Sequence, residues 1–164
     1  MRVLVFSDSH GDVETMKRAC VQFNPDWVLH LGDCIRDAMK LQEQLKLNHC
    51  CMVTGNCDLC SNGMDQRILE LQGVRIFMTH GHTYRVKFSP LRAALAAEEA
   101  QAQVLCFGHT HIPLCEQRNG MWILNPGACG GEKGTCGLIE IDAENGGVSC
   151  RIERIGGEPH DYSN

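Results

Sequence analysis

Five short hydrophobic runs in this chain end in an aspartate, an asparagine or a histidine, and a glycine lies beside most of these polar residues. The first run, Val3–Phe6, leads into Asp8-Ser9-His10-Gly11. The others end at Leu31-Gly32-Asp33, Thr54-Gly55-Asn56, Met78-Thr79-His80-Gly81-His82 and Phe107-Gly108-His109-Thr110-His111. Short apolar runs of this kind predict buried strands. One such ending is commonly an ordinary turn, whereas five of them predict a metal site spread over one face of a sheet.

The first part of the chain alternates strands with helices. Helical spacing predicts helices over 12–23 and 36–47, between strands at 3–6, 27–31 and 50–54. The buried stripe of the second helix is expected at Met39, Leu41, Leu45 and Leu47. A β-α-β-α-β order implies parallel strands with right-handed crossovers. Ligands of such sheets bind beyond the carboxyl ends of the strands, where Asp8, Asp33 and Asn56 fall.

The second part of the chain predicts a different pattern. A strand pair is expected at 67–71 and 74–79, followed by a helix at 90–102 and a buried strand at 104–107. From Leu114 onward we expect antiparallel strands, with turns at Asn119-Gly120 and at 144–147. We therefore expect one α/β domain over residues 1–155 and a loose tail over residues 156–164.

Composition excludes several classes of protein. The net charge of -5 argues against stable nucleic-acid binding, which requires a basic face. The chain has no apolar run of the ~20 residues that a membrane helix requires, and Asp8 follows too soon for a signal peptide. We therefore expect a cytoplasmic protein that makes no contact with a membrane.

The eleven cysteines predict no disulfide framework, because their number is odd and their spacing is irregular. We interpret most of them as small core residues in a reducing compartment. Cys57 and Cys60 fit a C-x-x-C pattern, but without a second pair nearby a zinc knuckle or redox pair is the weaker interpretation.

The five strand endings, in this order, resemble the motifs of the calcineurin-like metallophosphoesterase superfamily. The resemblance runs from Asp8 to about Ala128. The short length, Thr79-His80-Gly81-His82 and Asn125-Pro126-Gly127 resemble its small bacterial and archaeal phosphodiesterase branch. The resemblance implies a four-layer α-β-β-α sandwich, in which two mixed β-sheets pack face to face and helices flank them.

The resemblance also implies two divalent metal ions. One would be held by Asp8, His10, Asp33 and His111, and the other by Asp33, Asn56, His80 and His109. The carboxylate of Asp33 would bridge the two ions. Mixed carboxylate, imidazole and amide ligands suit transition metals better than Mg²⁺. We expect Mn²⁺ first, with Fe, Ni, Co and Zn as alternatives.

The function implied is hydrolysis of a small phosphoester by a hydroxide that bridges the two metals. Phosphodiesters are the first choice and monoesters the second. Loops 34–38, 57–66 and 81–90 are expected to line the site, although their composition names no particular substrate. The alternative is a protein-interaction scaffold, because a eukaryotic retromer subunit resembles the same fold. A homodimer is expected only because symmetric dimers are common.

The residues that the resemblance brings to the reaction are Asp33, Asn56, Cys57, Asp58 and His109. Many relatives carry a histidine where this chain has Cys57, and that histidine is thought to protonate the leaving group. A thiol is a poorer proton donor than an imidazolium near neutral pH, so this step is in doubt here. Asp58 would orient an imidazole at that position.

Several other polar residues have plainer interpretations. His30 and His49 fall outside the motifs and are expected to be satisfied or surface histidines. His82 is expected to support the ligands or anchor a loop. Asn125-Pro126-Gly127 is either a turn or a loop that helps to hold phosphate, and Thr110 is expected to turn the chain between two ligands.

Overall fold

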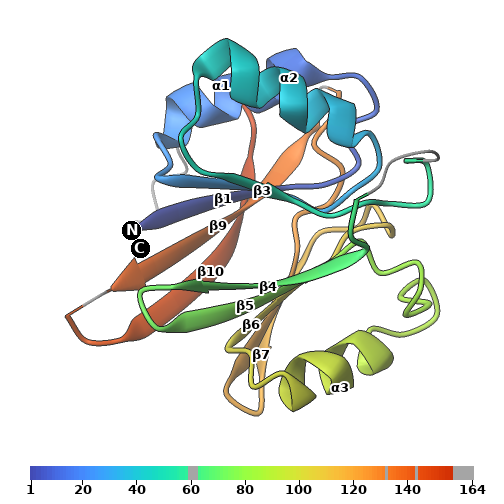
Figure 1. Ribbon diagram of the computed structural model, residues 1–164, viewed down its shortest axis with the longest axis vertical. Coiled ribbons are helices and arrows are strands. Elements are labelled where there is room, and N and C mark those ends of the chain that lie inside the picture. The colour runs from blue at the N-terminus through green and yellow to red at the C-terminus, as the bar shows by residue number, and fades with distance from the viewer. Residues whose placement is uncertain (59–62, 132, 143, 157–164) are drawn as a thin grey trace.

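The computed structural model describes residues 1–58, 63–131, 133–142 and 144–156, which contain ten strands and three helices (Figure 1). The first elements are β1 (Arg2–Phe6), α1 (Val13–Phe23), β2 (Trp27–His30), α2 (Ile35–Leu45) and β3 (Cys50–Met52). The remaining elements are β4 (Gln66–Leu71), β5 (Val74–Thr79), α3 (Leu91–Glu99), β6 (Val104–Cys106), β7 (Leu114–Arg118), β8 (Met121–Asn125), β9 (Thr135–Asp142) and β10 (Gly147–Arg154).

The first sheet has the strand order β10-β9-β1-β2-β3. β1 pairs with β2, and β2 with β3, in parallel, as the alternating first part of the sequence predicts. β9 and β10 form the expected hairpin, and β9 runs antiparallel to β1. Because Phe6 is in register with His30, the chain segments that follow β1 and β2 emerge side by side at one edge.

The second sheet has the order β4-β5-β6-β8-β7. The β4–β5 and β7–β8 hairpins were expected. The prediction that everything after Leu114 is antiparallel was wrong at one pairing, because β8 runs parallel to β6. The β7–β8 hairpin places its second strand against β6 and leaves β7 at the edge.

The elements form four layers, which confirms the predicted α-β-β-α sandwich. In Figure 1, α1 and α2 cover the first sheet at the top and α3 lies below the second sheet. Side chains alternate along β1 as in any strand, so Val5 packs between the two sheets and Phe6 packs beneath α1 and α2. A third apolar cluster joins α3 to the second sheet through Ala93 and Ala97.

The buried stripe of α2 differs from the expected one at Met39, which is 56% exposed. The residues that α2 buries completely are Ala38 and Leu41, three positions apart, and Leu45 packs against the same cluster one turn later. Leu47 also packs there, as predicted. Met39 is one residue, or about 100° of helical rotation, away from Ala38 and therefore faces solvent.

Most of the described cysteines are core residues, as expected. All ten are free thiols, and six of them, including Cys106 and Cys136, are buried. Burial raises the pKa of the Cys136 thiol to about 12. Cys60 and residues 157–164 lie outside the described part of the chain, so the C-x-x-C pattern and most of the expected tail are not covered. Within the described part, no helix is long and apolar enough to span a membrane.

We predict that Lys46→Gly stabilises the protein by about 0.5–1 kcal/mol. Lys46 ends α2 in a left-handed conformation (φ 51°), and its backbone N–H donates to the carbonyls of Gln42 and Glu43. Glycine adopts this conformation without the steric cost of a Cβ. Urea unfolding measures the change. Lys46→Ala, which keeps the Cβ, is the matched control, and equal stability of the two variants would contradict the prediction.

Candidate metal centre

The backbone around the predicted ligands has an unusual conformation. Asp8, His10, Asp33, His109 and His111 all have positive φ angles, between 45° and 67°. Aspartate and histidine tolerate this left-handed region better than most residues, yet each instance costs on the order of 1 kcal/mol. The packed sheets therefore hold five candidate ligands in a conformation that the free chain disfavours.

Two glycines of the sequence motifs allow close approach between the segments that carry these ligands. A Cβ on Gly108 would overlap the Ser7 hydroxyl, and one on Gly55 would overlap the Asp33 carboxylate. Gly55 and Gly108 are thus packing requirements, because only a residue without a side chain fits at these two positions.

The first ligand group comprises Asp8, His10 and His111, whose candidate ligand atoms all lie within 4.8 Å of one another. One oxygen of Asp8, Oδ2, accepts hydrogen bonds from the Ser7 hydroxyl at 2.6 Å and from the His109 backbone N–H at 3.1 Å. The other, Oδ1, is buried without a hydrogen bond from any described residue and lies 3.1 Å from His111 Nε2. A buried carboxylate oxygen left in this way suits a cation.

The second group comprises Asp33, His80 and His109, with ligand atoms again within 4.8 Å of one another. His80 is fully buried, and its Nδ1 lies 2.8 Å from the carbonyl of Leu31, to which it donates. Burial lowers the pKa of His80, so the ring is neutral and Nε2 presents a lone pair. A metal-binding histidine commonly donates its other ring N–H to a backbone carbonyl in this manner.

Three other potential ligand atoms lie close to His80 Nε2. Asn56 Oδ1 lies 3.2 Å away, His109 Nδ1 3.1 Å and Asp33 Oδ1 3.5 Å. Burial and the neighbouring His80 and Lys87 lower the pKa of His109 to about 4, so its ring is also neutral near pH 7. A neutral His109 carries one ring proton, and with that proton on Nε2 its Nδ1 lone pair would face the same space as the lone pair of His80 Nε2. A cation in that space would bind both rings and the oxygens of Asn56 and Asp33.

Asp33 lies in the second group, and its position in the first stays a prediction. The carboxylate is 3% exposed and accepts a hydrogen bond from the Cys57 backbone N–H at 2.8 Å. Burial alone would raise its pKa, but the Cys57 N–H and the nearby His80 hold the pKa below its ordinary value. Asp33 is therefore ionised at neutral pH.

A buried network behind the first group was missed by sequence reasoning. His30 is fully buried and accepts a hydrogen bond from the Gly32 N–H at Nδ1. Its Nε2 then donates to the Ser9 hydroxyl, which donates to Asp37 at 2.8 Å. Asp37 also accepts from the Gly11 N–H at 2.7 Å. This network fixes the loop that carries Asp8 and His10. His30 is a satisfied histidine, as expected, but its partner Asp37 gave no signal in the sequence.

The remaining residues of the predicted site lie around the two groups. Cys57 is exposed, and Asp33 with its hydrogen bond raises the pKa of the thiol to about 11. Asp58 accepts from the backbone N–H groups of Ile35 and Gly55, so it ties the start of α2 to the Asn56 loop. His82 lies beside the centre, with ring centroids 5.5 Å from His80 and 6.2 Å from His109.

Asn125 supports the loop of two ligands. Its Nδ2 donates to the Gly108 carbonyl and to the Thr110 hydroxyl, both at 3.0 Å, while its Oδ1 accepts from the Gly127 N–H. The turn interpretation of Asn125-Pro126-Gly127 therefore fits these contacts. Thr110 has the structural role that was expected. His49 is a surface histidine that stacks on Trp27.

Comparison with known proteins shows which family the chain resembles. Residues 1–144 match the profile of the calcineurin-like phosphoesterase superfamily domain. The probable metallophosphoesterase YsnB of Bacillus subtilis is 34% identical over 130 residues, which cover 78% of this chain and 75% of that protein. The phosphodiesterase YfcE of Escherichia coli K12 is 30% identical over 173 aligned positions, covering 87% of this chain and 89% of that protein.

Similar structures share the fold. Vps29 of Entamoeba histolytica, solved in complex with Zn²⁺, superimposes with a TM-score of 0.74 over 95% of this chain and all of its own, at 19% identity. This likeness shows the common fold and is consistent with the four layers described above.

We predict that His30 makes stability depend on pH. Burial lowers its pKa to about 4, against an ordinary 6.5, so between these values the unfolded chain binds the proton and the folded chain does not. The stabilisation is complete above pH 6.5 and is lost as the pH falls toward 4. In His30→Gln the fall of unfolding free energy between pH 7 and pH 5 should be smaller by about 1–2 kcal/mol.

Urea unfolding in EDTA at the two pH values tests this, because the chelator removes any contribution from metal binding. Ser149→Ala, which removes an exposed polar side chain from β10, is the control and should retain the wild-type slope. A His30→Gln variant with the same pH dependence as the wild type would refute the prediction.

Proposed function

Because this chain belongs to the calcineurin-like phosphoesterase superfamily, we propose that it is a phosphodiesterase with two divalent metal ions at the candidate centre. The family and the names of its relatives support a metal-dependent hydrolase of phosphoesters. The observation that supports the two-metal proposal is the clustering of potential ligand atoms in two groups, one with His80 Nε2 and the other with the buried Oδ1 of Asp8, which accepts no hydrogen bond from a described residue.

The residues present fit such ions. One ion would take Asp8, His10, Asp33 and His111, and the other Asp33, Asn56, His80 and His109. Asp33 would be the shared ligand, and its ionised carboxylate supports that role. Four imidazoles among the seven ligands favour Mn²⁺ or another transition metal over Mg²⁺.

The metals and the protein would divide the work. When bound, the two cations supply positive charge for the phosphoryl oxygens and a hydroxide nucleophile at neutral pH. The protein holds its ligands rigidly, since His80 is oriented by the Leu31 carbonyl and Asp8 by Ser7 and the His109 N–H. Rigid donors need not reorganise as charge develops on the substrate.

Phosphodiesters are the proposed substrate class. YfcE, whose alignment covers 87% of this chain, is called a phosphodiesterase. The same proposal gives residues 1–155 one domain, with 156–164 outside it, and places the enzyme in the cytoplasm, where free thiols such as the ten described here persist.

The alternative is a protein-binding scaffold that uses the same fold. The similarity to Vps29 is at 19% identity and therefore speaks for the fold alone. All seven candidate ligands are present in this chain, and five of them occupy left-handed positions that cost stability. This cost is explained by an enzyme more readily than by a scaffold.

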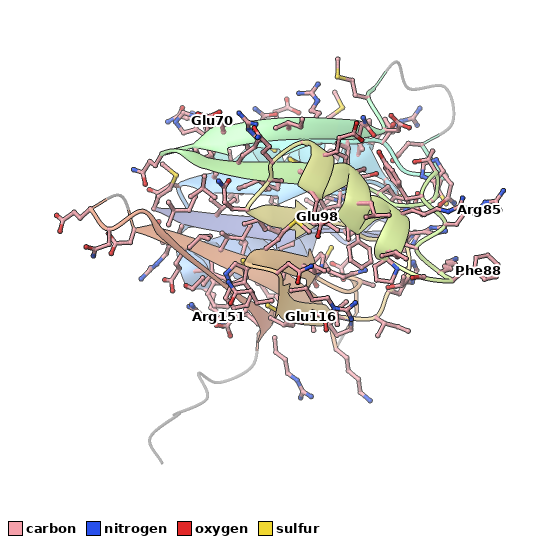
Figure 2. All side chains as sticks on the ribbon, turned by 90° about the horizontal axis from the view of Figure 1, so that it is seen from below. Glu70, Arg85, Phe88, Glu98, Glu116 and Arg151 are labelled. Carbon is pink, nitrogen blue, oxygen red and sulfur yellow. The ribbon has the colours of Figure 1, made fainter. Side chains whose placement is uncertain are left out.

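We predict that Asp33→Ala lowers turnover of bis(4-nitrophenyl) phosphate by about a thousandfold or more, because a shared ligand serves both metals. Its content of bound Mn²⁺, measured by elemental mass spectrometry, should fall toward zero. Glu98→Ala is the control, since Glu98 is an exposed carboxylate on α3 (Figure 2). Near-normal turnover by Asp33→Ala would end the two-metal proposal. Metal-loaded wild type without any turnover would favour the scaffold.

The role of Cys57 is tested by varying the leaving group. Nitrophenolate departs unprotonated, whereas an alkoxide needs a proton. If the thiol is the proton donor, Cys57→Ala should cost about 10²–10⁴-fold on an alkyl diester and much less on a nitrophenyl diester. Cys57→His should raise turnover of the alkyl diester above that of Cys57→Ala. Equal losses on both esters, with normal Mn²⁺ content, would show that leaving-group protonation is not the role of Cys57.

A further inference from the structure

A cavity of about 650 Å³ opens directly beside the candidate metal centre. His10 and Cys57 form the side next to the metal ligands, and the first turns of α2 form the far side through Arg36 and Lys40. A substrate whose phosphorus lies at the metals would therefore extend one arm into this space. Its lining decides which arm is accepted.

The carboxylates that line this cavity are already hydrogen-bonded to the protein, whereas its two cations have no partner among the described residues and can bind a ligand. The two carboxylates of the lining are committed to the protein, because Asp37 accepts from Ser9 and Gly11, and Asp58 accepts from Ile35 and Gly55. Asp37 is only 4% exposed. By contrast, Arg36 and Lys40 are exposed, and neither forms an ion pair or hydrogen bond with another described residue.

The spacing of the two cations places them together. Residues four apart on a helix are neighbours on one face, so Arg36 and Lys40 lie one above the other on α2. Asp37 is buried on a different face of the same helix. The cavity is therefore bordered by two adjacent positive charges that pair with no described residue, on a protein whose net charge is -5.

The other side of the centre has different chemistry. A second cavity of about 490 Å³ adjoins Thr110, between His109 and His111, and its lining is mostly apolar, with Val86, Phe107 and Ile112, but also contains one cation, Lys87. Phe88 lies in the same 81–90 loop, is 91% exposed, and points away from the body of the protein (Figure 2). Because this cavity offers a single cation among apolar side chains and the cavity beside α2 offers two adjacent cations, the cavity beside α2 is the better place for a negatively charged arm.

We propose that Arg36 and Lys40 are specificity-determining residues, and that the substrate is a phosphodiester with a second anionic group, such as a carboxylate or phosphate, on one arm. The inference rests on the proposed phosphodiesterase function and names the class of substrate within it. The second anion would lie between the guanidinium and ammonium groups, while the phosphodiester lies at the metals. Arginine and lysine both donate charge-assisted hydrogen bonds to such anions.

Two esters with the same leaving group test this. Propyl 4-nitrophenyl phosphate carries a neutral arm, and 2-carboxyethyl 4-nitrophenyl phosphate carries an arm of similar size that ends in a carboxylate. The readout is the ratio of kcat/KM for the charged arm to kcat/KM for the neutral arm, at fixed Mn²⁺. We expect wild type to favour the charged arm, and the ratio to fall as ionic strength rises.

Removing the cations should remove the preference. Arg36→Gln and Lys40→Gln should each lower the ratio about threefold, and the double variant about tenfold, as expected for exposed charge pairs. Lys46→Gln is the matched control, because it removes the same charge from the opposite end of α2 and should keep the wild-type ratio. Circular dichroism checks that the variants fold, which their exposed positions favour.

The outcomes separate the two levels of the proposal. Turnover of both esters with a wild-type ratio of one or less, or with a ratio that survives in the double variant, would overturn the assignment of Arg36 and Lys40 and leave the phosphodiesterase in place. An equal fall of the ratio in Lys46→Gln would also overturn the assignment, because it would show an effect of overall charge. Absence of any turnover by metal-loaded wild type would overturn the proposed function, and the specificity assignment with it.

Discussion

Two hydrogen bonds join the two sheets at the candidate centre, between segments at the carboxyl ends of their strands. The geometry of the site depends on these bonds. Asp8, which follows β1 in the first sheet, accepts from the backbone of His109, which follows β6 in the second. In the opposite direction, His80 at the end of β5 donates to the carbonyl of Leu31 at the end of β2. Each bond is worth only about 1 kcal/mol, but each fixes the orientation of a candidate ligand relative to the other sheet.

The core between the sheets makes these bonds possible. Leu31 and Met78, both completely buried, pack in the apolar cluster that joins the two sheets immediately beneath the site. Their burial supplies the stabilisation that offsets the left-handed backbone of the ligands and the desolvation of Asp8 and His80. The apolar interior between the sheets thus holds the edge of the sandwich rigid, and the candidate ligands lie at that edge.

Much of the fold was predictable because its signals are local. The three parallel strands of the first sheet, β1, β2 and β3, lie in largely apolar runs, and the polar residues that follow these runs mark the same edge. The pairing of β8 with β6 was not predictable, since a hairpin sequence specifies its own turn and not the strand beside which it will lie. The Ser9–Asp37 contact was missed for a similar reason, since the partners are 28 positions apart and Asp37 lies in no motif. Met39 was wrongly assigned to the buried face of α2 because it is next to the buried Ala38, and a short helix offers few residues from which to determine its buried face.

The left-handed ligands have a consequence for how such a sequence drifts over generations. At these five positions glycine or asparagine would fit the backbone more comfortably than the aspartates and histidines found there. A lineage freed from the need for a metal centre would therefore gain stability with its first substitutions, and the ligands would be among the earliest residues to disappear. The five positions therefore mark an edge of the fold at which the chain is less stable than its backbone would allow.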